Sequence, residues 1–233
     1  MKAVYIEQLG GPEVLTLGEL PDPVARPGQV VVDIHAASIN GADWKVRVGD
    51  GYKISTFPYI LGRDFSGFVS HVGEGVTDFR RGDAVFGVCD VGQEGTYCEQ
   101  IAIKASIIAR KPDSVSHVDE AALALTGLTA LVAVEDTLKL EAGEKILVQG
   151  GAGGVAGFAI QLAKHLGARV ITTASAANHA YIKSLGADEI IDYRAQDFTK
   201  VVSGCDAVFD TVGGAEAGRP RSVHRVRRPA AQA

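Results

Sequence analysis

The sequence has little cysteine and no long hydrophobic run. Cys89, Cys98 and Cys205 are the 3 cysteines among 233 residues, and they form no C-x-x-C pair, which argues against a zinc cluster or a disulfide framework. The longest clean apolar run, residues 121–134, is shorter than the roughly 20 residues that cross a bilayer. Glu7 stands where a signal peptide needs apolar residues. We therefore expect a cytoplasmic protein with reduced thiols.

The chain also lacks the positive charge of nucleic-acid-binding proteins. It has 23 basic and 28 acidic residues and a formal net charge of −5. Residues 215–233 hold five of the basic and one of the acidic residues, so residues 1–214 carry 18 and 27, a net charge of −9. An acidic body argues against a nucleic-acid surface. The basic tail has the charge of a nucleic-acid or membrane arm but no aromatic residue, so we predict an unstructured appendage and neither partner.

The composition is that of a folded protein. Apolar residues make up 46% of the chain and charged residues 22%, which excludes a disordered or collagen-like chain, and the length suits one large or two modest domains. The first half contains short β-branched runs that end at Gly, Pro or Asp turn signals. These runs are residues 30–34, 67–72, 84–88 and 97–103. Their spacing predicts a small β-barrel or sandwich.

The pattern changes after residues 111–113. Ser116 followed by Asp119 and Glu120 is typical of a helix start, because a hydroxyl and carboxylates suit the unsatisfied N–H groups of a first turn. An Ala- and Leu-rich helix should follow and be interrupted or adjusted at Thr126-Gly127. Strands are then predicted at 145–149, 169–173, 189–192 and 206–209, and helices at 155–166, 178–185 and 197–202. This alternation predicts a parallel α/β sheet.

A glycine-rich loop joins the first of these strands to the next helix. Gly151, Gly153 and Ala156 fit the pattern G-x-G-x-x-(G/A). The first glycine permits a tight turn, the second lets a diphosphate approach the backbone, and the small third residue lets helix and strand pack closely. The helix start, with Gly154 and Val155, offers N–H groups and a partial positive charge to that diphosphate. This context predicts a dinucleotide site, with a merely flexible turn as the alternative.

The end of the second predicted strand indicates which dinucleotide binds. An NAD-preferring site places Asp or Glu there for the ribose hydroxyls. Here residues 172–175 read Thr-Thr-Ala-Ser, and the first acid downstream is Asp188. The uncharged strand end leaves room for a 2′-phosphate, and the side chains that could hold it are Ser175, His179, Lys183, Tyr193 and Arg194. We therefore predict NADP(H) rather than NAD(H).

Several segments resemble those of one protein family and follow one another in the same order along the chain. They are Met1-Lys2-Ala3-Val4, Pro27-Gly28-Gln29, Ala37-Ser38-Ile39-Asn40, Leu61-Gly62-Arg63-Asp64, Gly82-Asp83-Ala84-Val85, Thr126-Gly127-Leu128-Thr129-Ala130, the glycine loop and Phe209-Asp210-Thr211-Val212-Gly213-Gly214. With them the chain resembles the zinc-free quinone oxidoreductases, which include zeta-crystallin, in the medium-chain dehydrogenase/reductase superfamily. The resemblance implies an α/β plus β fold: a GroES-like β-barrel domain at 1–117 and an incomplete Rossmann domain, a doubly wound parallel sheet, at 118–214. It also implies an active site between the two domains.

The resemblance bears on metal as well. In zinc-dependent relatives the positions of Asn40 and Arg63 look like those of a Cys and a His ligand, and a four-cysteine lobe binds a second zinc. Here a neutral amide and a cation stand at the two positions, so metal polarisation of a carbonyl is not expected. A zinc-type alcohol dehydrogenase is a distant alternative. We predict hydride transfer from NADPH to a quinone or an α,β-unsaturated carbonyl compound.

Five residues are candidates for the reacting end of the cofactor. By resemblance Asn40 faces the nicotinamide, and its amide can donate a hydrogen bond to the acceptor oxygen; the alternative is an asparagine that stabilises a turn. Tyr52 could cover the substrate pocket or donate a proton. Thr129 resembles a residue that contacts the nicotinamide or its ribose, unless it bonds its own helix backbone. Val212 and Gly213 follow the fourth strand, at the carboxyl edge where ligands collect.

The resemblance ends near residue 214. Only four strands of the six in a doubly wound sheet are recognisable before the sequence changes to Arg, Pro and Ala. A truncated or frameshifted reading frame would produce such a change. We expect an unpaired sheet edge, and the edge through which a homodimer would pair is expected to be missing. The alternative function is a non-catalytic remnant that at most binds NADPH.

Overall fold

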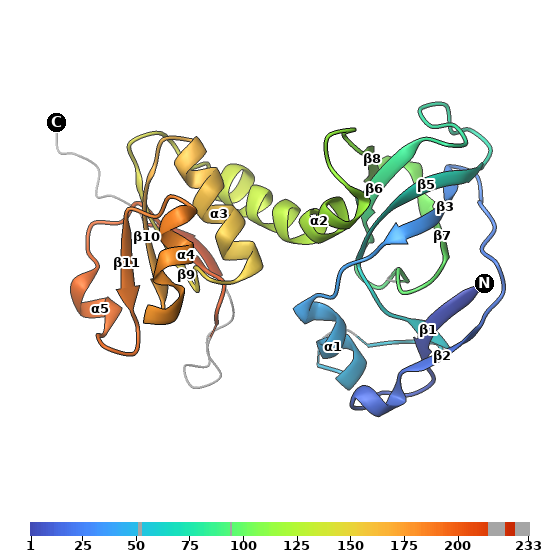
Figure 1. Cartoon of the computed structure of the whole chain (residues 1–233), viewed down its shortest axis with the longest axis horizontal. Coiled ribbons are helices and arrows are strands. Elements are labelled where there is room, and N and C mark those ends of the chain that lie inside the picture. Colours follow the sequence, from blue (N-terminus) through green and yellow to red (C-terminus); the bar gives the residue numbers. More distant parts are fainter. Residues whose placement is uncertain (51–52, 94, 214–221, 227–233) are drawn as a thin grey trace. The chain divides into compact units, whose positions relative to one another are not determined.

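The computed structural model describes residues 1–50, 53–93, 95–213 and 222–226. It divides into two compact units, Met1–Leu125 and Thr126–Ala233 (Figure 1). The sequence placed a domain boundary between residues 117 and 118, where helix α2 (His117–Leu131) begins, whereas the units divide within that helix. Each unit has buried clusters of its own.

The first unit is built from antiparallel strands. Its three-stranded sheet has the order β2-β1-β4, and its five-stranded sheet has the order β7-β3-β5-β6-β8. The strands are β1 Lys2–Ile6, β2 Thr16–Glu19, β3 Gln29–Ala36, β4 Tyr59–Ile60, β5 Asp64–Val72, β6 Ala84–Val88, β7 Gln100–Lys104 and β8 Ile108–Arg110. Helix α1 (Gly41–Val48) follows β3 in the sequence. Each of the runs predicted as strands overlaps β3, β5, β6 or β7.

The pairing of β3 with β5 positions one candidate site. Val30, Val32 and Phe65 from these strands are fully buried, as alternation of side chains across a pleated strand allows. Ala36 at the end of β3 lies opposite Ser66 near the start of β5. The antiparallel register therefore brings the segment after β3 close to the first residues of β5.

Helix α2 begins where the sequence predicted. Ser116 Oγ accepts the Asp119 N–H at 3.1 Å, which satisfies one N–H group of the first turn. The interruption or adjustment predicted at Thr126-Gly127 is wrong in its position, because the helix continues to Leu131 and changes only afterwards into a π-helical segment, Val132–Thr137. A single glycine costs about 1 kcal/mol in a helix, which the surrounding Ala and Leu residues offset. By length and composition alone His117–Thr137 could cross a membrane, a test that core helices of soluble proteins also pass.

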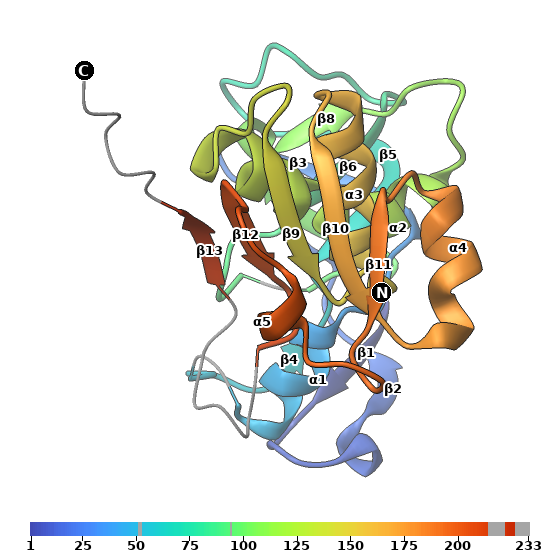
Figure 2. The same ribbon diagram turned by 90° about the vertical axis from the view of Figure 1, so that its left-hand side faces the viewer.

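The second unit contains one five-stranded sheet of order β11-β10-β9-β12-β13 (Figure 2). Its strands are β9 Lys145–Gln149, β10 Arg169–Ala174, β11 Glu189–Asp192, β12 Ala207–Asp210 and β13 Ser222–Arg225. Its helices after α2 are α3 Gly154–His165, α4 His179–Ser184 and α5 Phe198–Val201. Strands β9 to β12 pair in parallel, so the predicted parallel sheet and its four strands are confirmed.

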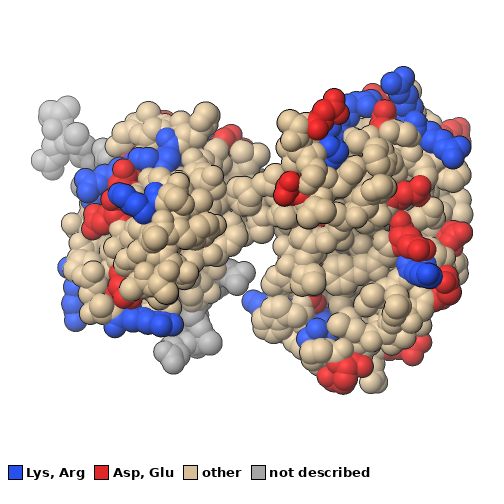
Figure 3. Space-filling model, in the orientation of Figure 1, with Lys and Arg blue, Asp and Glu red and all other residues tan. Residues whose placement is uncertain are grey.

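Helices cover both faces of this sheet. Ile146 and Val148 of β9 are buried in the cluster that contains Ala156 and Ile160 of α3. Leu147, between them in sequence, belongs to a separate cluster, which includes Ile171, Ile191 and, partly buried, Phe198 and Val202. The sheet is therefore doubly wound. Ala156 is fully buried, as expected for the small third residue of the glycine motif. Lys and Arg are interspersed with Asp and Glu on the face of each unit that Figure 3 shows.

The tail does not match the predicted unstructured appendage over residues 222–225. These residues form β13, which pairs antiparallel with β12. Composition alone does not reveal this strand, because the unpaired N–H and C=O groups of an edge strand offer partners to any segment that can reach them. Along β12, the expected unpaired edge is therefore covered. The remainder of residues 215–233, apart from Val226, lies outside the described residues.

Candidate functional site

The loop after β9 turns sharply before α3 begins. Gly150 has a φ of 77°, a conformation that favours glycine. Gly151 has no positive φ, but a Cβ atom on it would lie 2.2 Å from Thr172 Oγ1. Assigning the tight turn to Gly151 is therefore wrong. Gly150 makes the turn, and Gly151 must lack a side chain because β10 passes too close.

Threonines of β10 hold this loop in place. The Gly150 N–H donates to Thr173 Oγ1 at 3.1 Å, and the Gly151 N–H donates to the Thr173 carbonyl oxygen at 3.0 Å. Thr172 Oγ1 donates to the Val148 carbonyl oxygen at 2.6 Å. Sequence reasoning missed Gly150, Thr172 and Thr173 as loop-shaping residues. The available signal was a pair of hydroxyls at the end of an otherwise apolar strand.

The N-terminus of α3 follows the loop directly. Gly153 is the N-cap residue, and Gly154 and Val155 are the first residues of the helix. Because glycine has no side chain to bind the N–H groups of the first turn, these groups remain for a ligand, together with the partial positive charge of the helix end. Ala152, Gly153 and Gly154 are exposed. This is the geometry that an anionic diphosphate needs.

A pocket of about 630 Å³ opens beside the loop. Four residues predicted to contact the cofactor are part of its lining: Ser175, Tyr193, Val212 and Gly213. The other lining residues are Gln149, Gly150, Ala152, Thr173, Ala174, Asn178 and Phe198. The lining gathers around the carboxyl ends of β9, β10, β11 and β12, where ligands bind in doubly wound sheets. The volume lies within the range of small-molecule sites, about 300–1,000 Å³.

Asp210 shapes the pocket wall after β12. Its Oδ1 accepts the N–H groups of Val212 at 2.9 Å and Gly213 at 3.0 Å. Thr211 Oγ1 donates to the Gln149 carbonyl oxygen at 2.7 Å and so ties this segment to the end of β9. The segment is therefore held both by its own strand and by the neighbouring one.

Some predicted cofactor residues lie outside this pocket. The His179 ring contacts the Ala174 carbonyl oxygen through Nε2 at 3.3 Å, and Lys183 Nζ donates to the Ala187 carbonyl oxygen at 3.4 Å. Thr129 is exposed on α2 and does not line the pocket. Among the predicted donors, Ser175, Tyr193 and Arg194 remain the best placed to hold a 2′-phosphate.

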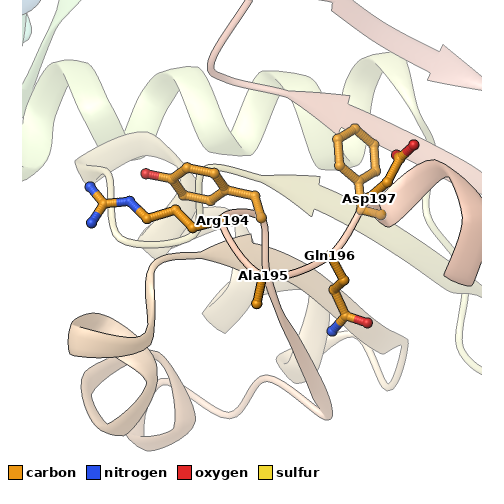
Figure 4. Close-up of a pocket in the computed structure, with 6 residues that line it drawn as sticks. Arg194, Ala195, Gln196 and Asp197 are labelled. Atoms are coloured by element: carbon orange, nitrogen blue, oxygen red, sulfur yellow. The ribbon is translucent and has the colours of Figure 1, made fainter.

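A second, open pocket of about 470 Å³ adjoins the first and shares Tyr193 and Phe198 with it. Residues 193–198 form it, and Figure 4 shows the Arg194 and Asp197 side chains extending away from each other at its two ends. The Arg194 guanidinium lies 5.8 Å from the centre of the Tyr193 ring, within cation–π range. Asp197 accepts from the Thr199 hydroxyl and N–H, which lower its pKa. Arg194 is thus a cation beside the pocket at the strand ends.

Asp188, the first acidic residue after β10, makes its hydrogen bonds near the amino end of β10, away from the pocket. Asp188 accepts from Lys164 Nζ at 2.9 Å and from the Val170 N–H at 2.7 Å. Desolvation raises the pKa of Asp188, but the bonds from Val170 and Lys164 outweigh it, and the pKa is lowered. Val170 lies near the amino end of β10, whereas the pocket lies at the carboxyl end. Asp188 therefore stabilises the packing of α3 on the sheet.

In the first unit, Asn40 belongs to a network of polar groups. Its Nδ2 donates to Asp64 Oδ2 at 2.9 Å and to Ser38 Oγ at 3.0 Å. Ser38 Oγ donates in turn to the same Oδ2 at 2.7 Å. Asp64 is fully buried, and a carboxylate only accepts, so the amide nitrogen must face it. Ser38 Oγ and Asp64 Oδ2 are only 2.7 Å apart, so a single N–H group of the Asn40 amide can point between them. The second N–H group of the amide can then donate to another acceptor.

Asp43 fixes the backbone at the same place. Its Oδ2 accepts the Asn40 N–H at 2.7 Å and the Tyr97 hydroxyl at 2.7 Å. Burial raises the pKa of Asp43 more than these bonds lower it, and burial together with Asp43 raises the pKa of Tyr97. Asn40 is thus held by both its main chain and its side chain. Tyr52, the other predicted catalytic residue, lies outside the described residues.

The residues at the expected zinc positions make other contacts. Asn40 bonds Asp64 and Ser38, and Arg63 Nη2 donates to the Cys89 carbonyl oxygen at 3.0 Å. Across the described part of the chain, no three His, Cys, Asp or Glu side chains gather where they could hold a metal ion.

A β-rich unit followed by a doubly wound unit with a diphosphate loop defines a two-domain dinucleotide-binding protein. Two family profiles match the chain: an alcohol dehydrogenase GroES-like domain over residues 26–113 and a zinc-binding dehydrogenase over residues 154–223. A chloroplast envelope quinone oxidoreductase homolog of Arabidopsis thaliana is 35% identical over 92% of this chain and 67% of that protein. The chain belongs to the quinone oxidoreductase family of the medium-chain dehydrogenase/reductase superfamily, which confirms the expected fold class.

Further relatives carry information on ligands. The NADPH-dependent alkenal/one oxidoreductase of Arabidopsis thaliana chloroplasts is 35% identical over 91% of this chain and 58% of that protein. The structure of Escherichia coli quinone oxidoreductase complexed with NADPH has a TM-score of 0.86 and 31% identity over 92% of this chain and 67% of that chain. This chain therefore spans roughly three fifths to two thirds of the length of these relatives.

Proposed function

We propose that the second unit binds NADP(H). The observation that carries this proposal is the pocket beside the N-terminus of α3, where Gly150 makes the turn and Gly153 leaves the N–H groups of the first turn uncapped. The diphosphate would accept hydrogen bonds from these groups. The relative solved with NADPH and the NADPH-dependent relative support this choice of ligand.

The preference for NADPH over NADH rests on the charges around Ser175. No acidic side chain lines the described pocket, whereas the hydroxyls of Ser175 and Tyr193 do. Arg194 adds a cation at the adjoining open pocket. A 2′-phosphate is stabilised by such donors, and a carboxylate in their place would repel it.

We propose further that the protein reduces a quinone or an α,β-unsaturated carbonyl compound. When bound, NADPH would supply a hydride, and the medium would supply a proton. In an enone the hydride goes to the β carbon and the proton to the α carbon, whereas in a quinone the two together give the hydroquinone. Asn40 would donate its second N–H to the acceptor oxygen, on which negative charge develops. Asp64 and Ser38 orient that amide, so little reorganisation is needed when the substrate binds.

The test is NADPH consumption by the purified full chain, with a benzoquinone and with an aliphatic enone as acceptors. With the enone, NADPH labelled with deuterium at the transferable position should give a saturated carbonyl product labelled at its β carbon, in step with NADPH oxidation. Asn40→Ala should lower kcat by tenfold or more, as expected for loss of a donor to a developing oxyanion, while the Kd of NADPH stays unchanged.

Other outcomes would decide against parts of the proposal. NADPH binding to a folded preparation without turnover of any conjugated acceptor would contradict the reaction and favour the cofactor-binding remnant. Activity that a chelator abolishes and zinc restores would favour the alcohol dehydrogenase alternative. A folded chain that binds neither NADPH nor NADH would contradict the proposal as a whole.

A further inference from the structure

Residues 222–226, called here the edge segment, occupy a defined place in the sheet of the second unit. In a doubly wound sheet of strand order 3-2-1-4-5-6, the strands β11, β10, β9 and β12 take the places 3, 2, 1 and 4. The edge segment lies in the fifth place, but β13 runs antiparallel to its neighbour. We propose that the edge segment is a strap that covers the outer side of β12 and holds β12 and the pocket wall after it in position.

Backbone and apolar contacts join the strap to β12. The register pairs Ala207 with Arg225 and Phe209 with Val223, and the Val226 N–H donates to the Asp206 carbonyl oxygen at 2.8 Å. Phe209 is buried, and Val223 packs partly buried against the same cluster. Side chains directly opposite on antiparallel strands share a face, so the strap extends the core and does not merely satisfy an edge.

Arg225 fastens the strap to the rest of the unit. Its guanidinium makes a two-pronged pair with Glu144, with Nη1 2.8 Å from Oε1 and Nη2 3.1 Å from Oε2. Its Nε donates to the Leu138 carbonyl oxygen at 2.8 Å, and Nη2 donates to that of Lys139 at 3.1 Å. Glu144 is mostly buried in this pair, with 17% of its side chain exposed. Such bidentate contacts are stronger and more directional than an exposed lysine pair.

The carbonyl groups that Arg225 binds lie at the end of the long helix. The π-helical segment ends at Thr137, and Lys139 has a positive φ of 48°, as residues that end a helix often do. The last carbonyl groups of a helix lack partners within it and carry a partial negative charge. Arg225, in the edge strand, therefore binds both the end of the helix and Glu144, the residue that precedes β9.

The strap also bears on the dinucleotide pocket through β12. This strand is held by β9 on one side and by β13 on the other. It ends at Asp210, whose carboxylate binds the N–H groups of the pocket residues Val212 and Gly213. Without the strap, the last strand before this wall would become the edge of the sheet. This part of the inference rests on the proposed NADP(H) site.

The test compares Arg225→Ala and a chain that ends at residue 221 with the full chain. Thermal unfolding of the second unit should begin about 5 °C lower for Arg225→Ala and lower still for the shortened chain. Amide hydrogen exchange in residues 206–210 should be about tenfold faster in both variants, while exchange in β10 stays unchanged. The Kd of NADPH should rise about threefold or more.

Two matched controls separate the strap from general effects. Arg169 forms an exposed pair with Glu189 at 3.5 Å in the same unit, and Arg169→Ala should leave both readouts unchanged. A chain that ends at residue 226 keeps the edge segment and should behave as the full chain does.

Each outcome decides one part. If Arg225→Ala unfolds and exchanges as Arg169→Ala does, the strap is wrong, whether or not the shortened chain folds. If stability falls while the Kd of NADPH is unchanged, the link to the pocket is overturned and the strap remains. A full chain that binds no NADPH contradicts the proposed function, and the unfolding and exchange measurements still decide the strap.

Discussion

At the scale of single residues, the two glycines that open the loop are required for different reasons. Gly150 adopts a conformation that other residues rarely take, whereas Gly151 has an ordinary conformation but no room for a methyl group beside Thr172. The same motif therefore combines a backbone constraint and a packing constraint. Sequence alone shows the spacing of the glycines, but not which constraint acts at which position.

Gly151→Ala tests the packing constraint. We expect it to destabilise the second unit by about 1–3 kcal/mol, because Thr172 would have to move from a buried hydrogen-bonded position. We also expect weaker NADPH binding. Denaturant unfolding and a titration with NADPH would measure both effects.

Gly127→Ala in α2 is the matched control for this change. A Cβ atom on Gly127 meets no atom within 4 Å, so this substitution should stabilise the helix by about 0.5–1 kcal/mol. If Gly151→Ala is as stable as the parent protein, Thr172 in β10 can move aside at little cost and the packing constraint is wrong.

Ser175 and Arg194 provide a test of cofactor choice. Ser175→Asp should weaken NADPH binding at least tenfold and leave NADH binding equal or improved, because a carboxylate repels the 2′-phosphate and accepts from a free ribose hydroxyl. Arg194→Ala should weaken NADPH binding alone, by a few-fold at this exposed position. The ratio of the two dissociation constants is the measurement. Equal losses for both cofactors would show that these residues do not contact the 2′ position.

At the scale of elements, the turn between β5 and β6 depends on one carboxylate. Asp83 Oδ2 accepts the Arg80 N–H at 2.9 Å and lies 2.7 Å from Nη1 of Arg110, in β8. The bond from the Arg80 backbone, more than the opposing burial, lowers the pKa of Asp83, and Arg110 lowers it further. The turn is thereby linked to the last strand of the sheet.

This lowered pKa fixes the sign of a pH dependence. An unfolded Asp has a pKa of about 3.9, so Asp83 contributes its full stability above that pH and loses it as the pH falls through its folded pKa. Asp83→Asn should cost about 1.5–3 kcal/mol at pH 7 and remove this part of the acid sensitivity. Urea unfolding at several pH values measures both effects.

Asp90→Asn serves as the control for Asp83, because Asp90 pairs with Lys104 where both side chains are largely exposed. Its effect should stay below about 1 kcal/mol. A constant difference between Asp83→Asn and the parent protein from neutral to acid pH would contradict the linkage.

Sequence patterns predicted the elements with strong local signals. The bounds of β9 and β11 match the prediction, because buried parallel strands read as continuous apolar runs that end at turn residues. The two-residue strand β4 and β13 have no such signal. Strand β13 forms because β12 leaves an edge and Arg225 reaches Glu144 and two distant carbonyl groups. Such contacts join segments far apart in the sequence, so local composition does not reveal them.

The same limit applies to the candidate site. Ser175, Tyr193, Val212 and Gly213 could be predicted because they follow strand ends, which meet at one edge of a parallel sheet. His179 has the chemistry to hold a phosphate but does not follow a strand end, and its ring instead contacts a backbone carbonyl oxygen. The orientation of the Asn40 amide depends on Asp64, which becomes its neighbour only through the pairing of β3 with β5.

At the scale of the whole molecule, each of the two units has buried clusters of its own, and the chain contains a single tryptophan. Trp44 lies in α1 of the first unit, so its fluorescence reports that unit, whereas far-ultraviolet circular dichroism reports both. NADPH at about 100 times its Kd should stabilise the unit that binds it by about 2.7 kcal/mol. We expect NADPH to shift the dichroism transition and leave the Trp44 transition unchanged. If both transitions shift together, the units unfold as one.

The antiparallel direction of β13 has a consequence for how the second unit folds. A parallel neighbour of β12 would need a crossover of a dozen or more residues, usually with a helix, whereas only residues 211–221 separate β12 from β13. Closing so short a connection costs little chain entropy, but it requires β12 to be in place first. β12 itself pairs with β9, and the whole β10–α5 segment lies between them. The pairing of β9 with β12 should therefore limit the folding rate, and β13 should pair with β12 quickly, as the last step.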